Sequence, residues 1–137
     1  MPKFSGRRLF LASLLLFFAS FNFVHGQDPQ SQITGVWRGS SECALKDSPC
    51  HDEINVYRFS GIAGKPGWFS GIGSKIVDGK EIAMGTLEWS YDAEKHTLES
   101  RNPGGTFRLV VNGNKIEGVL TSPDNTVYRR IHLKKEN

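Results

Sequence analysis

The chain has 137 residues, of which 38% are hydrophobic and 23% charged, with 15 glycines and two cysteines. This length supports one small domain with a single core and is too short for two. Three cations, Lys3, Arg7 and Arg8, lie in the first 26 residues, and the rest of the chain carries 14 cations against 14 acidic residues. Such a balance gives the chain no electrostatic reason to bind nucleic acid or an anionic membrane.

The first segment in chain order, residues 1–26, is typical of a secretory signal peptide. A basic start is followed by an apolar run from Leu9 to Phe18, and the modest side chains of Val24 and Gly26 precede Gln27. The run is about half of the roughly 20 apolar residues that a membrane-spanning helix needs. We therefore expect cleavage before Gln27, export to the periplasm or the medium, and no stable membrane insertion.

After this segment, the sequence is typical of an all-β domain. Residues 27–32 are polar and contain Pro29, which predicts a flexible lead-in, and residues 33–137 are predicted to form a single β-barrel domain. Groups of Gly, Pro, Asn and Asp interrupt the domain at short intervals, and no stretch has a convincing helical period. Eight segments between these turns have strand composition: Thr34–Ser41, Ile54–Ser60, Trp68–Val77, Glu81–Ser90, His96–Ser100, Thr106–Val111, Lys115–Thr121 and Thr126–Leu133.

Eight strands joined in sequence by short loops predict an eight-stranded antiparallel up-and-down barrel, because closure removes exposed sheet edges. A β-sandwich is the alternative. Alternation of apolar and polar residues is clear in the later strands. In Ile54–Ser60, large apolar residues occur on both faces of the strand, so the sequence does not decide which face points inward. The interior of such a barrel is either filled by side chains or holds one small ligand.

The first loop contains Cys43 and Cys50, the only cysteines. An even number of cysteines in an exported chain predicts one disulfide. His51 and Glu53, beside it, are weak candidates for metal ligands, because a metal needs three or four converging groups. The alternative is a carboxylate that accepts backbone N–H bonds or pairs with an arginine. We predict no metal and no cofactor.

Catalysis has little support in the sequence. It contains no Gly-x-Ser-x-Gly, no His-Glu-x-x-His and no phosphate-binding loop, so we expect a protein that is not an enzyme. Loops alternate between the two ends of a meander, and the first loop is the longest, so we expect any ligand to enter at its end. Five residues are candidates for facing a ligand: Leu45, Ser48, Trp68, Trp89 and Phe107. The alternative is that aromatic side chains fill the interior.

The run Gly35-Val36-Trp37 on the first predicted strand, together with Arg129 on the apolar face of the last, resembles the signature of small secreted bacterial lipocalin-like (calycin-type) β-barrel proteins. The resemblance implies that Arg129 packs over Trp37 at the closed end of a barrel. Periplasmic metalloprotease inhibitors are similar in size and architecture, and they too have a disulfide.

Two functions fit these expectations. The first is an exported lipocalin-like binding protein for a small apolar or amphipathic ligand. The alternative is a protein-interaction module, such as a periplasmic protease-inhibitor-like barrel. The internal volume distinguishes them, since a cavity of about 300 Å³ or more favours the first. The sequence identifies neither the ligand nor the partner, and it does not determine the oligomeric state.

Overall fold

The structure is a computed structural model that describes Pro2 and residues 28–137, so the predicted signal peptide falls outside the described residues except for Pro2. The described part contains one short helix and eight strands: α1 (Pro29–Ile33), β1 (Gly35–Cys43), β2 (Glu53–Gly61), β3 (Trp68–Val77), β4 (Lys80–Asp92), β5 (Thr97–Asn102), β6 (Gly105–Asn112), β7 (Lys115–Thr121) and β8 (Val127–Lys135). Over these residues, no helix is long and apolar enough to cross a membrane.

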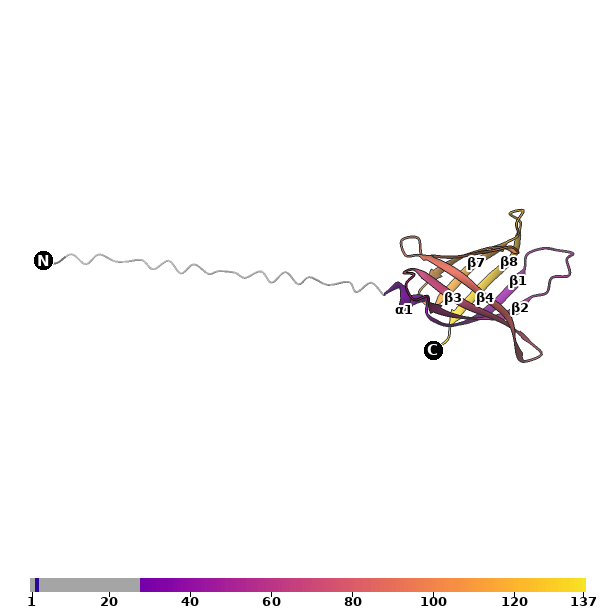
Figure 1. Ribbon diagram of the computed structural model, residues 1–137, viewed down its shortest axis with the longest axis horizontal. Helices are drawn as coiled ribbons and strands as arrows, with labels where there is room; N and C mark the ends of the chain where they lie inside the picture. The colour runs from indigo at the N-terminus through magenta and orange to yellow at the C-terminus, as the bar shows by residue number, and fades with distance from the viewer. Residues whose placement is uncertain (1, 3–27) are drawn as a thin grey trace.

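The strands form one closed antiparallel barrel in which each strand pairs with the next along the chain and β8 pairs with β1. Figure 1 shows the barrel from its side, with α1 at the left and the β1–β2 loop and the β3–β4 turn projecting at the right. The predicted up-and-down barrel is confirmed, and the sandwich alternative is wrong. The predicted strands are all present, with ends that differ by at most two residues.

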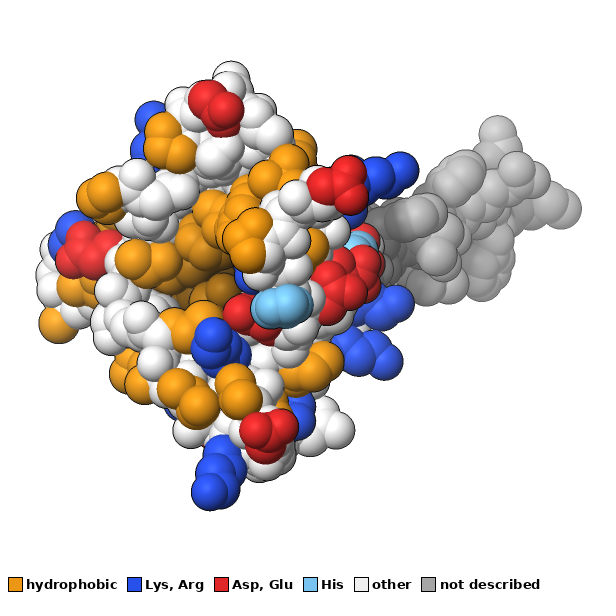
Figure 2. All heavy atoms as spheres, turned by 90° about the vertical axis from the view of Figure 1, so that its right-hand side faces the viewer, with side chains coloured by type: hydrophobic (Ala, Val, Ile, Leu, Met, Phe, Trp, Pro, Cys, Tyr) orange, Lys and Arg blue, Asp and Glu red, His pale blue; other side chains and the backbone are white. Residues whose placement is uncertain are grey.

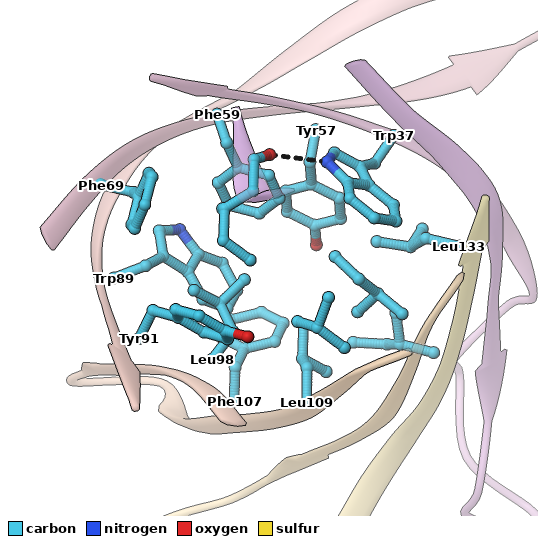
Figure 3. Close-up of a cluster of buried hydrophobic side chains, with 14 residues drawn as sticks. Trp37, Tyr57, Phe59, Phe69, Trp89, Tyr91, Leu98, Phe107, Leu109 and Leu133 are labelled. Atoms are coloured by element: carbon cyan, nitrogen blue, oxygen red, sulfur yellow. Dashed lines mark hydrogen bonds between the residues drawn. The ribbon is translucent and has the colours of Figure 1, made fainter. Parts of the chain in front are cut away.

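The barrel interior is rich in aromatic residues. Residues of one parity point inward from each strand, as the two-residue period of a strand requires. In β2 the inward residues include Tyr57 and Phe59, which settles the face that the sequence left open. Figure 3 shows these side chains meeting at the middle of the barrel. The core cluster is Ile33, Trp37, Tyr57, Phe59, Phe69, Trp89, Tyr91, Leu98, Phe107, Leu109, Val111, Ile116, Ile131 and Leu133.

One end of the barrel is closed by α1, where the sequence led us to expect a flexible lead-in. Pro29 occupies the first turn, and the Asp28 carboxylate caps the helix by accepting the Gln30 N–H at 3.2 Å. Ile33 is fully buried, and its carbonyl accepts the indole N–H of Trp37 at 2.8 Å. The polar sequence of this segment gives no sign that it closes the barrel, because its one buried residue, Ile33, is the last residue of the helix. We call this the closed end.

The opposite end, which carries the β1–β2 loop and the β3–β4, β5–β6 and β7–β8 turns, is the open end. Here the wall of the barrel is incomplete. β4 pairs with β5 only over Ser90–Asp92, although β4 begins at Lys80. Among the described residues, no strand pairs with the earlier part of β4 on its β5 side, and a bulge lies where β4 passes Gly73 and Ser74. The β3–β4 hairpin therefore projects past the barrel and leaves a lateral opening.

Candidate ligand-binding site

A hollow of about 300 Å³ lies at the open end, beneath the lateral opening. One wall is the β4 segment Met84–Leu87, and the other comes from the β5–β6 hairpin, with Phe107, and from Leu120 of β7; Tyr57 lies on the β2 side. Figure 2 views this end of the barrel and shows a central depression with hydrophobic side chains around and below it. The arrangement can hold a small, mostly apolar molecule.

On β3, glycine occupies two successive inward positions that border the hollow. Gly71 pairs with Phe59 and Gly73 with Tyr57 on β2. A Cβ atom at Gly71 would lie 2.5 Å from Nε1 of Trp89, and one at Gly73 would lie 3.2 Å from the Tyr57 ring. The large aromatic rings of β2 and β4 thus occupy space that β3 side chains would otherwise fill.

Above the hollow, the open end carries a cluster of charged and polar side chains centred on Glu53. Its carboxylate lies 3.6 Å from the Arg129 guanidinium and 3.5 Å from Nζ of Lys75, and it accepts the amide N–H of Asn55 at 3.2 Å. Arg129 also donates to the carbonyl of His51 at 3.0 Å. The Arg129 side chain is 13% exposed, so these contacts compensate a largely buried charge.

The cluster supports the β1–β2 loop, which the predicted disulfide also braces. Cys43 and Cys50 are bonded, with Cα atoms 5.9 Å apart, so this prediction is confirmed. The Asp52 carboxylate accepts the N–H of Cys43 at 2.8 Å. His51 and Glu53 were weak candidates for metal ligands, but within the described residues no group of three His, Cys, Asp or Glu side chains is placed to hold a metal. Glu53 is instead the partner of Arg129.

Arg129 does not pack over Trp37, contrary to the implication of the resemblance. It pairs with Cys43 in the β1–β8 register and therefore lies at the open end, whereas Trp37 pairs with Lys135 at the closed end. Nζ of Lys135 lies 5.5 Å from the centre of a Trp37 ring and donates to two α1 carbonyls, Ser31 at 2.9 Å and Gln32 at 3.0 Å. Burial lowers the pKa of Lys135. The cation over the Trp37 indole is thus Lys135, six residues further along β8 than Arg129.

Of the five candidates for facing a ligand, Phe107 alone lines the hollow. Trp89 is fully buried and lies against Phe107, with ring centres 5.0 Å apart. Leu45 and Ser48 belong to the disulfide loop, in which the Ser48 hydroxyl donates to the Leu45 carbonyl at 3.4 Å. Trp68 is 39% exposed and lies under the Lys65 ammonium, away from the hollow.

Sequence reasoning missed Tyr57, Met84, Leu87 and Leu120 as lining residues. The signal that could have indicated Tyr57 is Gly71-x-Gly73 in a strand, because two glycines on one face require large side chains from neighbouring strands to fill the space. No comparable signal marks Met84, which reaches the hollow through the β4 bulge.

A larger groove, of about 500 Å³, lies near the closed end between α1 and the β2–β3 loop. It borders Asp28, where the continuous described part begins, so the described residues do not define its full outline. The hollow is smaller, but all the strands around it belong to the described part of the chain, and apolar side chains line it. We therefore take the hollow as the candidate site.

The phenol of Tyr57, at the hollow, has a strongly shifted pKa. Burial raises the pKa of its phenol to about 12, the negative charge of Glu53 adds to the rise, and Arg129 opposes it. Because the folded pKa is above the ordinary value of about 10, the associated stability is present below pH 10 and is lost as pH rises toward 12. We expect NMR of ¹³Cζ-labelled tyrosine to show one resonance with a midpoint near pH 12 that is missing in Tyr57→Phe. A Tyr57 midpoint near 10 would contradict this.

Comparisons with known proteins do not assign the chain to a family. No family model matches it, and a search of the curated proteins finds no match. Evidence on what the hollow does must come from the residues themselves.

Proposed function

We propose that this protein is an exported, lipocalin-like binding protein that holds a small, mostly apolar ligand in the hollow at the open end. The observation that carries the proposal is the hollow itself, an apolar space of about 300 Å³ in a barrel whose other end is closed by α1. This volume is at the lower limit of ordinary ligand pockets, which favours a ligand of modest size. The ligand class follows from the lining, in which Leu87, Phe107 and Leu120 are hydrophobic and no charged residue takes part.

Two further features support export and binding. The Cys43–Cys50 disulfide is stable in an oxidising compartment, which agrees with the sequence signature of residues 1–26. The disulfide, Arg129 and Glu53 brace the longest loop beside the hollow, and a binding site benefits from a rim that keeps its shape.

Ethylnaphthalene, an uncharged fluorescent hydrocarbon, tests the proposal by equilibrium dialysis. We expect wild-type protein to bind it and Leu120→Trp to weaken binding at least tenfold, because the larger side chain fills space that Leu120 borders. Val110→Trp is the matched control, since Val110 is 51% exposed on the outside of β6. It should bind ethylnaphthalene like the wild type.

Thermal melts of both tryptophan variants show whether the barrel stays folded. A folded Leu120→Trp variant that binds ethylnaphthalene unchanged would overturn the proposal. So would wild-type protein that binds neither ethylnaphthalene nor acetylnaphthalene, its analogue with one carbonyl oxygen. The two variants add the same side chain to neighbouring strands, so nonspecific adsorption to tryptophan would affect them equally.

A second candidate function is contact with a protein partner, and the β3–β4 hairpin favours it. Ile82 and Met84 of β4 are both nearly half exposed, and the β4 edge beside them is unpaired among the described residues. Exposed edges of this kind accept an extended peptide as an added strand. Ile82→Glu separates the two functions, because it should abolish partner binding and leave ethylnaphthalene in the hollow.

A further inference from the structure

Three of the residues that line the hollow have polar side-chain groups: Tyr57, Thr86 and Asn102. Of these, Tyr57 alone is buried in the core, whereas Thr86 is exposed and Asn102 is half-buried. Tyr57 is 5% exposed, and its ring is fixed by Phe59, at 5.9 Å between ring centres, and by Trp89, at 6.0 Å. Figure 3 shows the ring extending from β2 with its oxygen directed toward the middle of the barrel. Packing on both rings leaves the hydroxyl little freedom to turn away.

This hydroxyl forms no hydrogen bond with any residue in the described part of the chain, and no hydrogen bond is among the causes of its pKa shift. Two other polar tips of the core have partners: Tyr91 donates to Gln32 at 3.1 Å and Trp37 to the Ile33 carbonyl. Over the described residues, Trp89 Nε1 is the single fully enclosed side-chain polar atom without a partner. The Tyr57 oxygen is not enclosed in this way and therefore borders the hollow that Tyr57 lines.

An unpartnered buried donor is costly unless something accepts its proton. A purely hydrocarbon ligand would exclude water from the hollow and leave the Tyr57 hydroxyl without any acceptor. A ligand with an oxygen acceptor at the same place would satisfy it. The donor therefore discriminates between two molecules of equal shape.

The electrostatic environment selects among acceptors. Burial and Glu53 raise the pKa of Tyr57, and Arg129 lowers it by less. Negative charge is thus disfavoured at the end of the ring, and a carboxylate placed there would meet the same burial and the same Glu53. Lys75, the other cation of the cluster, is already engaged with Glu53 at 3.5 Å. A neutral acceptor avoids this cost.

We propose that the ligand is an uncharged molecule with an apolar body and a carbonyl-type oxygen, and that the hydroxyl of Tyr57 donates a hydrogen bond to that oxygen. The apolar body lies against Leu87, Phe107 and Leu120. The proposal rests on the proposed function, because it names the chemistry of the molecule in the same hollow.

Acetylnaphthalene and ethylnaphthalene test this assignment, since they have nearly the same shape and differ in one carbonyl oxygen. The measured quantity is the ratio of their dissociation constants in equilibrium dialysis. We expect Tyr57→Phe to reduce the relative preference for acetylnaphthalene about three- to tenfold, the range of one net hydrogen bond. The affinity for ethylnaphthalene should stay unchanged or improve.

Tyr91→Phe is the matched control, because it removes a tyrosine hydroxyl that already has partners at the closed end. It should leave the ratio unchanged. Naphthoate, the carboxylate analogue, should bind wild-type protein at least tenfold more weakly than acetylnaphthalene at neutral pH. In the wild type, the ¹³Cζ resonance of Tyr57 should shift with acetylnaphthalene and not with ethylnaphthalene, a measurement that does not depend on the folding of a variant.

The outcomes separate the two proposals. If both neutral compounds bind and Tyr57→Phe leaves their ratio unchanged, or if the Tyr57 resonance does not distinguish them, the assignment of Tyr57 is wrong and the hollow remains a binding site. Tighter binding of naphthoate than of acetylnaphthalene overturns the uncharged ligand. Failure of both neutral compounds to bind the wild type overturns both proposals.

Discussion

Gly39→Ala is expected to destabilise the barrel by about 3–5 kcal/mol, or to prevent folding, because β1 and β8 meet too closely there for a side chain. A Cβ atom at Gly39 would lie 1.9 Å from the carbonyl oxygen of His132 and 2.9 Å from Cα of Leu133. These are backbone atoms, so no side-chain rotation relieves the collision. The strands must separate where the barrel closes.

Urea denaturation gives the free energy of unfolding, and Gly113→Ala in the β6–β7 turn provides the control. No atom lies within 4 Å of a Cβ placed at Gly113, although its φ of +59° favours glycine. That variant should lose only about 1 kcal/mol, the cost of the backbone conformation. Equally small losses in the two variants would show that the contact with β8 is not what requires glycine at position 39.

Arg129→Ala is expected to destabilise the protein by about 2–3 kcal/mol. The substitution removes donors to the carbonyls of Ser41, at 3.2 Å, and His51, at 3.0 Å, and separates the guanidinium from Glu53. Glu53 keeps Lys75 and Asn55 as partners, which holds the loss below that of a fully isolated buried charge. Thermal and urea denaturation measure the change.

Arg130→Ala is the control for this prediction, since Arg130 is the next residue on β8 and is exposed on the outside. We expect it to change the free energy of unfolding by no more than about 0.5 kcal/mol. If Arg129→Ala is equally mild, the contacts of the guanidinium are not what stabilises the open end.

The fold could be predicted from the sequence because its signals are local. Turn residues mark each connection, and alternating side chains mark the strands between them, so neighbouring strands pair in chain order. The disulfide also followed from local information, since the chain contains only two cysteines and they are seven residues apart. The same local signals failed for α1, because only the barrel end provides the apolar surface that buries Ile33.

The candidate site depended on contacts between distant segments. Arg129 and Lys135 have the same parity on β8, so both point inward, and alternation cannot say which of them reaches Trp37. That choice is made by the register in which β8 closes on β1, which is a property of the whole barrel. Lys135 meets the indole at the closed end, and Arg129 meets Glu53 at the open end.

The hollow likewise required the tertiary structure. Local signals in the sequence were enough for an eight-stranded barrel with a braced first loop, and one of the five candidate ligand-facing residues, Phe107, lines the hollow. It could not show that Gly73 faces Tyr57 or that β4 leaves β5 after three paired residues. Cross-strand neighbours of this kind are fixed by register and closure, and these decide which side chains fill the interior and which hydroxyl is left to face open space.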